Sequence, residues 1–287
     1  MLPCEEIDWH AADGAALFAR CWRPRAETAG VICLIHGLGE HSGRYAEMAA
    51  QCAQAGYAVL AFDLRGHGKS AGRRGHYPSF DVAMDDVGLL LDWAEKLWPG
   101  RSPVLYGHSL GGNLALNYAL RRSPAGLNAV IAASPALRPG FVVPPWKTTL
   151  GKWLYRAWPT FSLPNGLERT ALSRRPEVIQ AYLADPLVHD RVSARFGLDF
   201  LQAGEWALSQ ADRFSLPLLL MIGSADRLVS TTAVAQFAAK VGSRCTLKVW
   251  EGLYHETHNE PERWQVIDFA LAWLAGLRQI SPTNLSL

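Results

Sequence analysis

One stretch, residues 103–113, constrains the fold of this chain more than any other. A short apolar run stops at Gly107, Ser109 follows two residues later, Gly111 comes two residues after the serine, and a helical pattern begins near Asn113. A serine held at a sharp turn between a strand and a helix projects its hydroxyl above the sheet. A Cβ at either glycine would collide with neighbouring backbone. The stretch therefore predicts a strand–turn–helix unit with Ser109 at its apex.

The surrounding chain alternates buried strands with helices. Continuous apolar runs, typical of strands covered on both faces, lie at residues 31–35, 57–62, from 104, at 129–133, 216–222 and 245–250. Helical patterns lie at about 45–55, 81–98, from 113, at 231–241 and 261–277, and Asp81 is the expected N-cap of the second. A hairpin around Asp13-Gly14 is expected within residues 5–22. This order predicts an α/β protein with a mostly parallel, doubly wound sheet.

The alternation stops at Pro135 and resumes after residue 212. The stretch between is rich in prolines and aromatic residues and has the pattern of irregular helices. We interpret residues 137–212 as a helical cap, or lid, inserted into one α/β core formed by residues 1–136 and 213–287. A chain of 287 residues is long enough for one such core. The aromatic residues of the cap either fill its own interior or line an acyl pocket, and the sequence leaves both interpretations open.

The composition indicates an ordinary globular protein. Hydrophobic residues make up 49% of the chain and charged residues 19%, and the net charge of +2 gives no indication of nucleic-acid binding. The five cysteines are scattered and form no C-x-x-C pair, which fits a reducing cytoplasm better than a disulfide framework or a zinc site. We see no signal-peptide pattern and no apolar run near the ~20 residues that span a bilayer. We therefore expect a cytoplasmic protein, and the oligomeric state is not indicated.

Two residues at other strand ends complete a catalytic constellation with Ser109. A serine hydroxyl is a weak nucleophile until a base takes its proton, and the base is usually a histidine oriented by a carboxylate. Asp226 follows the strand expected at 216–222, and His255 follows the strand expected at 245–250. The carboxyl ends of parallel strands meet at one edge of a sheet. The sequence therefore predicts Ser109 as nucleophile, His255 as general base and Asp226 as the orienting acid.

The same chemistry needs donors for the oxyanion of the tetrahedral intermediate. One donor should be the N–H of Leu110, the residue after the nucleophile, and the other should come from the loop after the first buried strand. In that loop, Leu38 lies between Gly37 and Gly39, which allow the backbone to turn inward. We therefore predict the N–H groups of Leu38 and Leu110 as the oxyanion hole. An ordinary glycine-rich turn is the alternative interpretation of this loop.

Several other motifs resemble functional sites, but the residues around them do not fit those sites. A second G-x-S-x-G centres on Ser70, and Gly68-Lys69-Ser70 resembles the end of a phosphate-binding loop. Asp63 stands where that loop needs its first glycine, and no helix follows at once. We therefore expect the loop from Asp63 to Ser70 to pack beside the site as structure. No zinc-binding pattern is formed by His36, His41, His67, His76, His108 or His258. We predict no metal and no cofactor.

Four stretches closely resemble the monoacylglycerol lipase and lysophospholipase branch of the α/β-hydrolases, also described as serine aminopeptidase-like. They are His36–Tyr45, Asp63–Ser70, Gly107–Gly112 and Tyr254–His258. The resemblance covers about residues 10–278 and implies an α/β-hydrolase fold, the triad Ser109, Asp226 and His255, and a helical cap over an apolar tunnel. It further implies that Glu40, Arg44 and His258 lie near the glycerol end of the pocket and bind the head group.

From these observations we expect a serine carboxylester hydrolase acting on monoacylglycerols or related single-chain lipid esters through an acyl-enzyme. The alternatives are a lysophospholipase, a short- or medium-chain carboxylesterase, an aminopeptidase, or a non-catalytic ligand-binding protein on a hydrolase scaffold. An aminopeptidase should need acidic groups for the substrate ammonium, whereas residues 138–175 hold seven basic side chains and one acid. Basic and aromatic residues suit an anionic lipid surface. We therefore predict peripheral contact with the inner membrane face through Lys147, Lys152 and Arg156.

Overall fold

A computed structural model describes residues 3–122 and 126–280. Its centre is an eight-stranded sheet in the order β1-β2-β4-β3-β5-β6-β9-β10. The first two strands run antiparallel to their neighbours, and every other pair is parallel. The strands are β1 (Cys4–His10), β2 (Ala16–Trp22), β3 (Gly30–Ile35), β4 (Tyr57–Phe62), β5 (Val104–His108), β6 (Ala129–Ala133), β9 (Leu218–Gly223) and β10 (Cys245–Trp250). The mostly parallel sheet is therefore confirmed, with an antiparallel hairpin at one edge.

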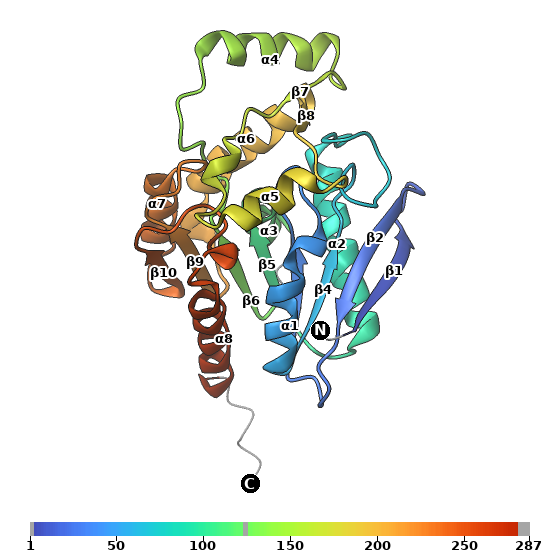
Figure 1. The fold of residues 1–287 in the computed structure, drawn as a ribbon, viewed down its shortest axis with the longest axis vertical. Helices are drawn as coiled ribbons and strands as arrows, with labels where there is room; N and C mark the ends of the chain where they lie inside the picture. Colours follow the sequence, from blue (N-terminus) through green and yellow to red (C-terminus); the bar gives the residue numbers. More distant parts are fainter. Residues whose placement is uncertain (1–2, 123–125, 281–287) are drawn as a thin grey trace.

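Helices cover both faces of this sheet (Figure 1). One face packs against α1 (Ala46–Gln54) and α8 (Arg263–Ile280). The other packs against α2 (Phe80–Leu97), α3 (Leu110–Arg121) and α7 (Thr231–Val241). Apart from Gly30 at the start of β3, all residues of β3, β4 and β6 are buried and apolar, because both faces of these strands are covered. The doubly wound prediction is therefore confirmed.

Two local predictions need correction. Asp81 is not the N-cap of α2, because Ser79 holds the extended conformation of a cap and its hydroxyl accepts the Val82 N–H, which places Asp81 in the first turn. The second concerns residues 137–212, where only irregular helices were expected. The structure also has a small antiparallel pair of strands there, β7 (Ser162–Pro164) and β8 (Arg191–Ser193). Strands of three residues are too short to show a hydrophobic period.

Residues 137–212 lie beyond the end of the sheet that carries the loops after β3 and β5 (Figure 1). They contain α4 (Pro145–Ala157), α5 (Pro176–Ala184) and α6 (Ala194–Ser209). Phe196 of α6 belongs to the main hydrophobic core, and the Asn113 side chain of α3 donates to the Phe200 carbonyl oxygen at 3.1 Å. By contrast, α4 packs mainly on α6. The division into a core and a cap at residues 137 and 212 stays a prediction, and we keep the word cap for residues 137–212.

Candidate active site

Ser109 lies between β5 and α3 in a backbone conformation that side chains rarely adopt, with φ 53° and ψ −113°. Hydrogen bonds fix it there: its N–H donates to the Ala133 carbonyl oxygen at 2.9 Å, and its own carbonyl accepts the Ala136 N–H at 2.9 Å. The surrounding structure must stabilise this strained residue, as is common at reactive positions. Ser109 is partly exposed, while its neighbours His108 and Leu110 are buried.

The two glycines around Ser109 are required by close backbone approach. A Cβ on Gly107 would lie 2.2 Å from the Gly111 carbonyl oxygen, and a Cβ on Gly111 would lie 2.1 Å from the Ile35 carbonyl oxygen. Real Cβ atoms do not approach backbone this closely. Small residues therefore let α3 start directly against the end of β3, where the loop with Leu38 begins.

His255 and Asp226 form a buried hydrogen-bonded pair. The His255 Nδ1–H donates to Asp226 Oδ2 at 2.8 Å, and the other carboxylate oxygen accepts the N–H groups of Leu228 and Val229 at 2.8 and 3.1 Å. Burial lowers the pKa of His255, but the Asp226 charge and hydrogen bond outweigh it and raise the pKa above the ordinary 6.5. Burial by itself would raise the pKa of Asp226, but the interaction with His255 outweighs burial and holds the pKa of that carboxyl below its ordinary value.

Neighbouring loops hold His255 at the edge that carries Ser109. The His255 carbonyl oxygen accepts the Ser134 hydroxyl at 2.8 Å, and His108 Nε2 approaches it at 3.4 Å. The His108 and His255 rings lie 4.9 Å apart. Among the described residues, neither the Ser109 hydroxyl nor His255 Nε2 has a hydrogen-bond partner, so this state holds the acid–base pair without the contact to Ser109. In substrate-free sites this contact is often long and shortens when substrate binds.

The peptide between Gly37 and Leu38 has a fixed orientation. The Leu64 N–H donates to His36 Nε2 at 2.8 Å, so the ring proton of His36 must be on Nδ1. That Nδ1–H donates to the Gly37 carbonyl oxygen at 2.7 Å. Because the C=O and N–H of a trans peptide point in opposite directions, this bond turns the Leu38 N–H away from His36. Burial lowers the pKa of His36, which keeps its ring neutral. No pattern in the sequence assigns His36 this role.

The predicted oxyanion donors stay predictions, and their surroundings are clear. The Leu110 N–H is at the first position of α3, where no intrahelical acceptor exists and the helix dipole is positive. The Leu38 N–H has no backbone acceptor among the described residues. The two loops lie close together, since a Cβ built on Gly37 would be 3.3 Å from the Ser109 Cβ.

The three predicted head-group residues, Glu40, Arg44 and His258, are brought together, and all lie inside the protein. Glu40 is 2% exposed, Arg44 pairs with it and also with Glu256, and His258 is 2% exposed. The His258 ring stacks on Tyr45 with centroids 4.8 Å apart, and neither of its nitrogens has a hydrogen-bond partner among the described residues. Burial lowers the pKa of His258 to about 3, so its ring is neutral. Direct contact with a head group stays a prediction for these residues.

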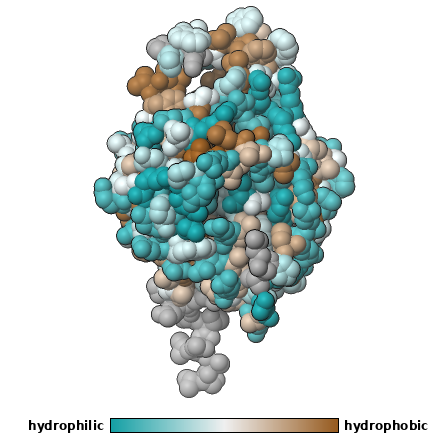
Figure 2. All heavy atoms as spheres, viewed as in Figure 1, coloured by the Kyte–Doolittle hydropathy of each residue, from teal (hydrophilic) through white to brown (hydrophobic). Residues whose placement is uncertain are grey.

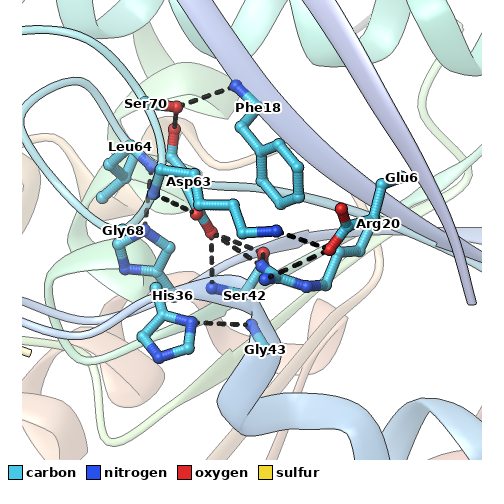
Figure 3. A network of polar contacts seen from close by, with 12 residues as sticks. Glu6, Phe18, Arg20, His36, Ser42, Gly43, Asp63, Leu64, Gly68 and Ser70 are labelled. Carbon is cyan, nitrogen blue, oxygen red and sulfur yellow. Dashed lines mark hydrogen bonds and ion pairs between the residues drawn. The ribbon is translucent and has the colours of Figure 1, made fainter. Parts of the chain in front are cut away.

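The loop that carries the second G-x-S-x-G supports the site from beside it. Asp63 is fully buried and accepts the Ser42 N–H at 2.8 Å and the Lys69 N–H at 2.8 Å, while Arg20 lies 3.4 Å away (Figure 3). The Ser70 hydroxyl donates to the Asp63 carbonyl oxygen at 2.5 Å and accepts the Phe18 N–H at 2.9 Å. Both hydroxyl functions are thus taken by backbone groups, which confirms the structural interpretation of this loop.

The cap is tied to three loops of the site by backbone hydrogen bonds that the sequence does not reveal. They are Gly140 N–H to Leu228 O at 2.9 Å, Glu256 N–H to Leu172 O at 2.8 Å, and His189 N–H to Gly39 O at 2.9 Å. These bonds reach the acid loop, the histidine loop and the loop with Leu38. Within residues 3–122 and 126–280, no group of three or more His, Cys, Asp and Glu residues could hold a metal ion.

Comparison with known families and proteins gives consistent matches. The family described as serine aminopeptidase, S33, matches residues 26–262. A monoacylglycerol lipase of Mycolicibacterium smegmatis is 34% identical over 271 residues, which are 94% of this chain and 96% of the relative. The phospholipase YtpA of Bacillus subtilis is 34% identical over 246 residues, or 85% of this chain and 94% of the relative.

Two further matches differ in how much of the other chain they cover. This chain spans only 28% of an uncharacterized abhydrolase domain-containing protein of Dictyostelium discoideum, with 36% identity over 265 residues, which are 92% of this chain. The crystal structure of Paleococcus ferrophilus monoacylglycerol lipase superimposes with a TM-score of 0.82 at 33% identity, covering 96% of this chain and all of that chain.

Proposed function

The chain belongs to the serine aminopeptidase S33 family of α/β-hydrolases, in its monoacylglycerol lipase-like branch, and on that premise we propose that it hydrolyses monoacylglycerols. It is an ester-hydrolysing serine hydrolase. The observation that carries the proposal is the strained Ser109 at the sheet edge that also holds the buried His255–Asp226 pair. The relatives of nearly equal length then favour a monoacylglycerol as substrate.

In the proposed reaction, the Ser109 hydroxyl oxygen attacks the ester carbonyl carbon while His255 Nε2 takes its proton. The negative charge that forms on the carbonyl oxygen is stabilised by the N–H groups of Leu38 and Leu110. His255 returns the proton to the leaving glycerol oxygen, and Asp226 holds the required tautomer throughout. Water then loses a proton to His255 and attacks the acyl-enzyme carbonyl carbon, the bond between that carbon and the Ser109 oxygen breaks, and His255 returns the proton to Ser109 as the fatty acid leaves.

A direct comparison of substrates tests the head group. The purified chain is assayed with a long-chain monoacylglycerol, a lysophosphatidylcholine of the same acyl chain, and p-nitrophenyl esters of several lengths. We expect the highest kcat/KM among the two lipids for the monoacylglycerol. A higher value for the lysophosphatidylcholine would favour the second candidate, a phospholipase, which the similarity to the Bacillus subtilis phospholipase supports.

The cap offers a surface that suits a lipid interface. Three tryptophans on or beside α4 are more than half exposed, Trp146 at 62%, Trp153 at 64% and Trp158 at 54%. Hydrophobic side chains gather at the α4 end of the molecule (Figure 2). Lys152 and Arg156 are exposed on the same helix, and the Lys147 side chain lies outside the described part of the structure. Such a surface can insert its aromatic rings while its cations meet anionic lipid.

Other basic residues of the cap form ion pairs within the protein. Four of the seven pair with acidic side chains, namely Arg138, Arg169, Arg174 and Arg175. The basic surface is therefore smaller than the composition of residues 138–175 suggests. None of the helices in the described ranges is long and apolar enough to cross a membrane. We propose that contact with the membrane is peripheral, on the cytoplasmic side, and that α4 makes it.

Vesicle binding tests this contact. A double Lys152→Glu and Arg156→Glu variant should lose binding to vesicles containing phosphatidylglycerol, while Lys96→Glu on α2 serves as the matched control. Turnover of a short soluble ester should stay the same in both variants, because neither change touches the site. Equal binding of the wild type to zwitterionic and anionic vesicles would contradict the proposed role of the cations.

A further inference from the structure

A buried cluster of ion pairs joins the loop that carries Leu38 to the loop that carries His255. Arg44 contacts the Glu40 carboxylate on one side and binds Glu256 through two hydrogen bonds of 2.7 and 2.8 Å on the other. Glu40 and Glu256 are 2% and 1% exposed, and the Arg44 side chain is 10% exposed. Two buried carboxylates therefore share one guanidinium. Separating either carboxylate from Arg44 would leave an unpaired charge inside the protein, which is strongly unfavourable.

The Glu40 end of the cluster acts on the predicted oxyanion loop. Glu40 Oε1 accepts the Gly37 N–H at 2.6 Å and the Tyr45 hydroxyl at 2.7 Å. The bond from Glu40 fixes the N–H of Gly37, and the bond from the His36 ring fixes the carbonyl of Gly37. The orientation of the following Leu38 N–H is therefore set by two buried side chains.

The Glu256 end acts on the catalytic base. Glu256 is the residue after His255, and its N–H donates to the Leu172 carbonyl oxygen at 2.8 Å. A second connection runs through His108, which lies 3.4 Å from Glu40 Oε1 with one ring nitrogen and 3.4 Å from the His255 carbonyl oxygen with the other. The Tyr182 ring of the cap covers the Arg44 guanidinium at 4.8 Å.

We propose that Glu40, Arg44 and Glu256 are positioning residues that set the oxyanion loop and the catalytic histidine in their relative places. The inference rests on the proposed function only for the identity of the nucleophile and the base. It differs from head-group binding, because a positioning cluster affects every ester alike, whereas a head-group site affects only substrates that carry glycerol. The ion pairs already satisfy these side chains within the protein, which favours positioning.

The test measures Glu256→Gln, which keeps the shape of the side chain and removes its charge. Its matched control is Asp86→Asn, because Asp86 is 2% exposed and binds Arg65 through two hydrogen bonds of 3.0 and 2.8 Å, and in the described structure it has no hydrogen bond to Glu40, Arg44, Glu256 or His255. Each variant is assayed with p-nitrophenyl butyrate and with a monoacylglycerol, per folded active site. We expect Glu256→Gln to lower kcat at least tenfold on both esters with KM within threefold, and Asp86→Asn to keep kcat within threefold.

The pH profile gives a readout that a purely structural role would not change. After Asp226, the charges of Glu256 and Glu40 also raise the pKa of His255. The acid limb of kcat/KM should therefore move to lower pH in Glu256→Gln and stay in place in Asp86→Asn. If Glu256→Gln does not fold, Arg44→Lys is measured with the two esters, because lysine keeps the charge and loses the paired hydrogen bonds.

Three results would overturn the proposal. They are an unchanged kcat on p-nitrophenyl butyrate in folded Glu256→Gln or Arg44→Lys, a rise in KM for the monoacylglycerol alone, and equal losses of kcat in Asp86→Asn and Glu256→Gln. Failure of the proposed substrate is a separate result, since it is read on the wild type as hydrolysis of p-nitrophenyl butyrate without hydrolysis of the monoacylglycerol.

Discussion

The substitution Asp226→Asn tests the role of the buried acid with little change of shape. The amide oxygen of asparagine can still accept the Leu228 and Val229 N–H groups that Asp226 Oδ1 accepts now. Its NH₂ group would face His255 Nδ1, which must then accept a hydrogen bond instead of donating one. The ring proton moves to Nε2, the nitrogen that has to take the proton from Ser109.

The expected loss of kcat is large because, in Asp226→Asn, nearly all molecules hold the His255 ring in the tautomer that cannot accept the Ser109 proton. An acid-to-amide change at this position of a catalytic triad lowers kcat by about 10⁴, equivalent to about 5.4 kcal/mol of activation free energy. The fully buried carboxylate, 2.8 Å from the histidine, makes the lost interaction a charge-assisted hydrogen bond in a site that water does not screen.

The assay is kcat for p-nitrophenyl butyrate, with circular dichroism to verify the fold. Asp185→Asn is a close control, because Asp185 Oδ2 lies 2.8 Å from His41 Nε2 and its Oδ1 accepts the Leu187 N–H at 2.8 Å. In this second aspartate–histidine pair neither residue is hydrogen-bonded to Ser109 or His255, so kcat should stay within threefold. A folded Asp226→Asn enzyme with kcat within tenfold of the wild type would refute the reasoning.

Three further predictions use other parts of the structure. Ser70→Ala should lower the free energy of unfolding by about 1–3 kcal/mol, because it leaves the buried Phe18 N–H without an acceptor, while kcat per folded molecule is unchanged; a loss of kcat would assign Ser70 to the chemistry. Gly111→Ala should lower both Tm and kcat, because its Cβ would lie 2.1 Å from the Ile35 carbonyl oxygen, and a variant as stable and active as the wild type would show that the close approach is absent in solution. For a neutral ester, kcat/KM should rise with pH through a midpoint above 6.5, because only neutral His255 accepts a proton and its pKa is raised; a midpoint at or below 6.5 would contradict the charged Asp226 partner.

Much of the fold could be predicted because buried parallel strands have an unambiguous pattern. The strands at Tyr57–Phe62 and Cys245–Trp250 and the helix Thr231–Val241 lie at the expected residues. The strand, the flanking glycines and the helix around Ser109 indicate its position. Asp226 and His255 are indicated by residue type, chain order and position after a strand, because the carboxyl ends of parallel strands share one edge. The structure places Asp226 against His255 as the pattern predicts, and their catalytic roles stay predictions until they are measured.

The supporting interactions could not be predicted, because they join residues far apart in the chain. Arg44 and Glu256 are separated by 212 positions, and nothing in their local sequence indicates that they pair. A charged residue in a loop has the pattern of solvated surface, whereas these side chains are buried because each meets its counterion. The one available signal was that Glu256 directly follows a predicted catalytic histidine. The cap is harder still, since its fixed points are backbone hydrogen bonds that any side chain allows.

The central claim is that Ser109 is the nucleophile of an esterase, and covalent labelling tests it most directly. The wild type is treated with a fluorophosphonate, its intact mass is measured, and the modified residue is located by peptide mapping. We predict one adduct, on Ser109, with loss of ester hydrolysis in proportion to labelling, and neither labelling nor turnover in Ser109→Ala. An adduct on Ser70, or retained turnover in folded Ser109→Ala, would contradict the account.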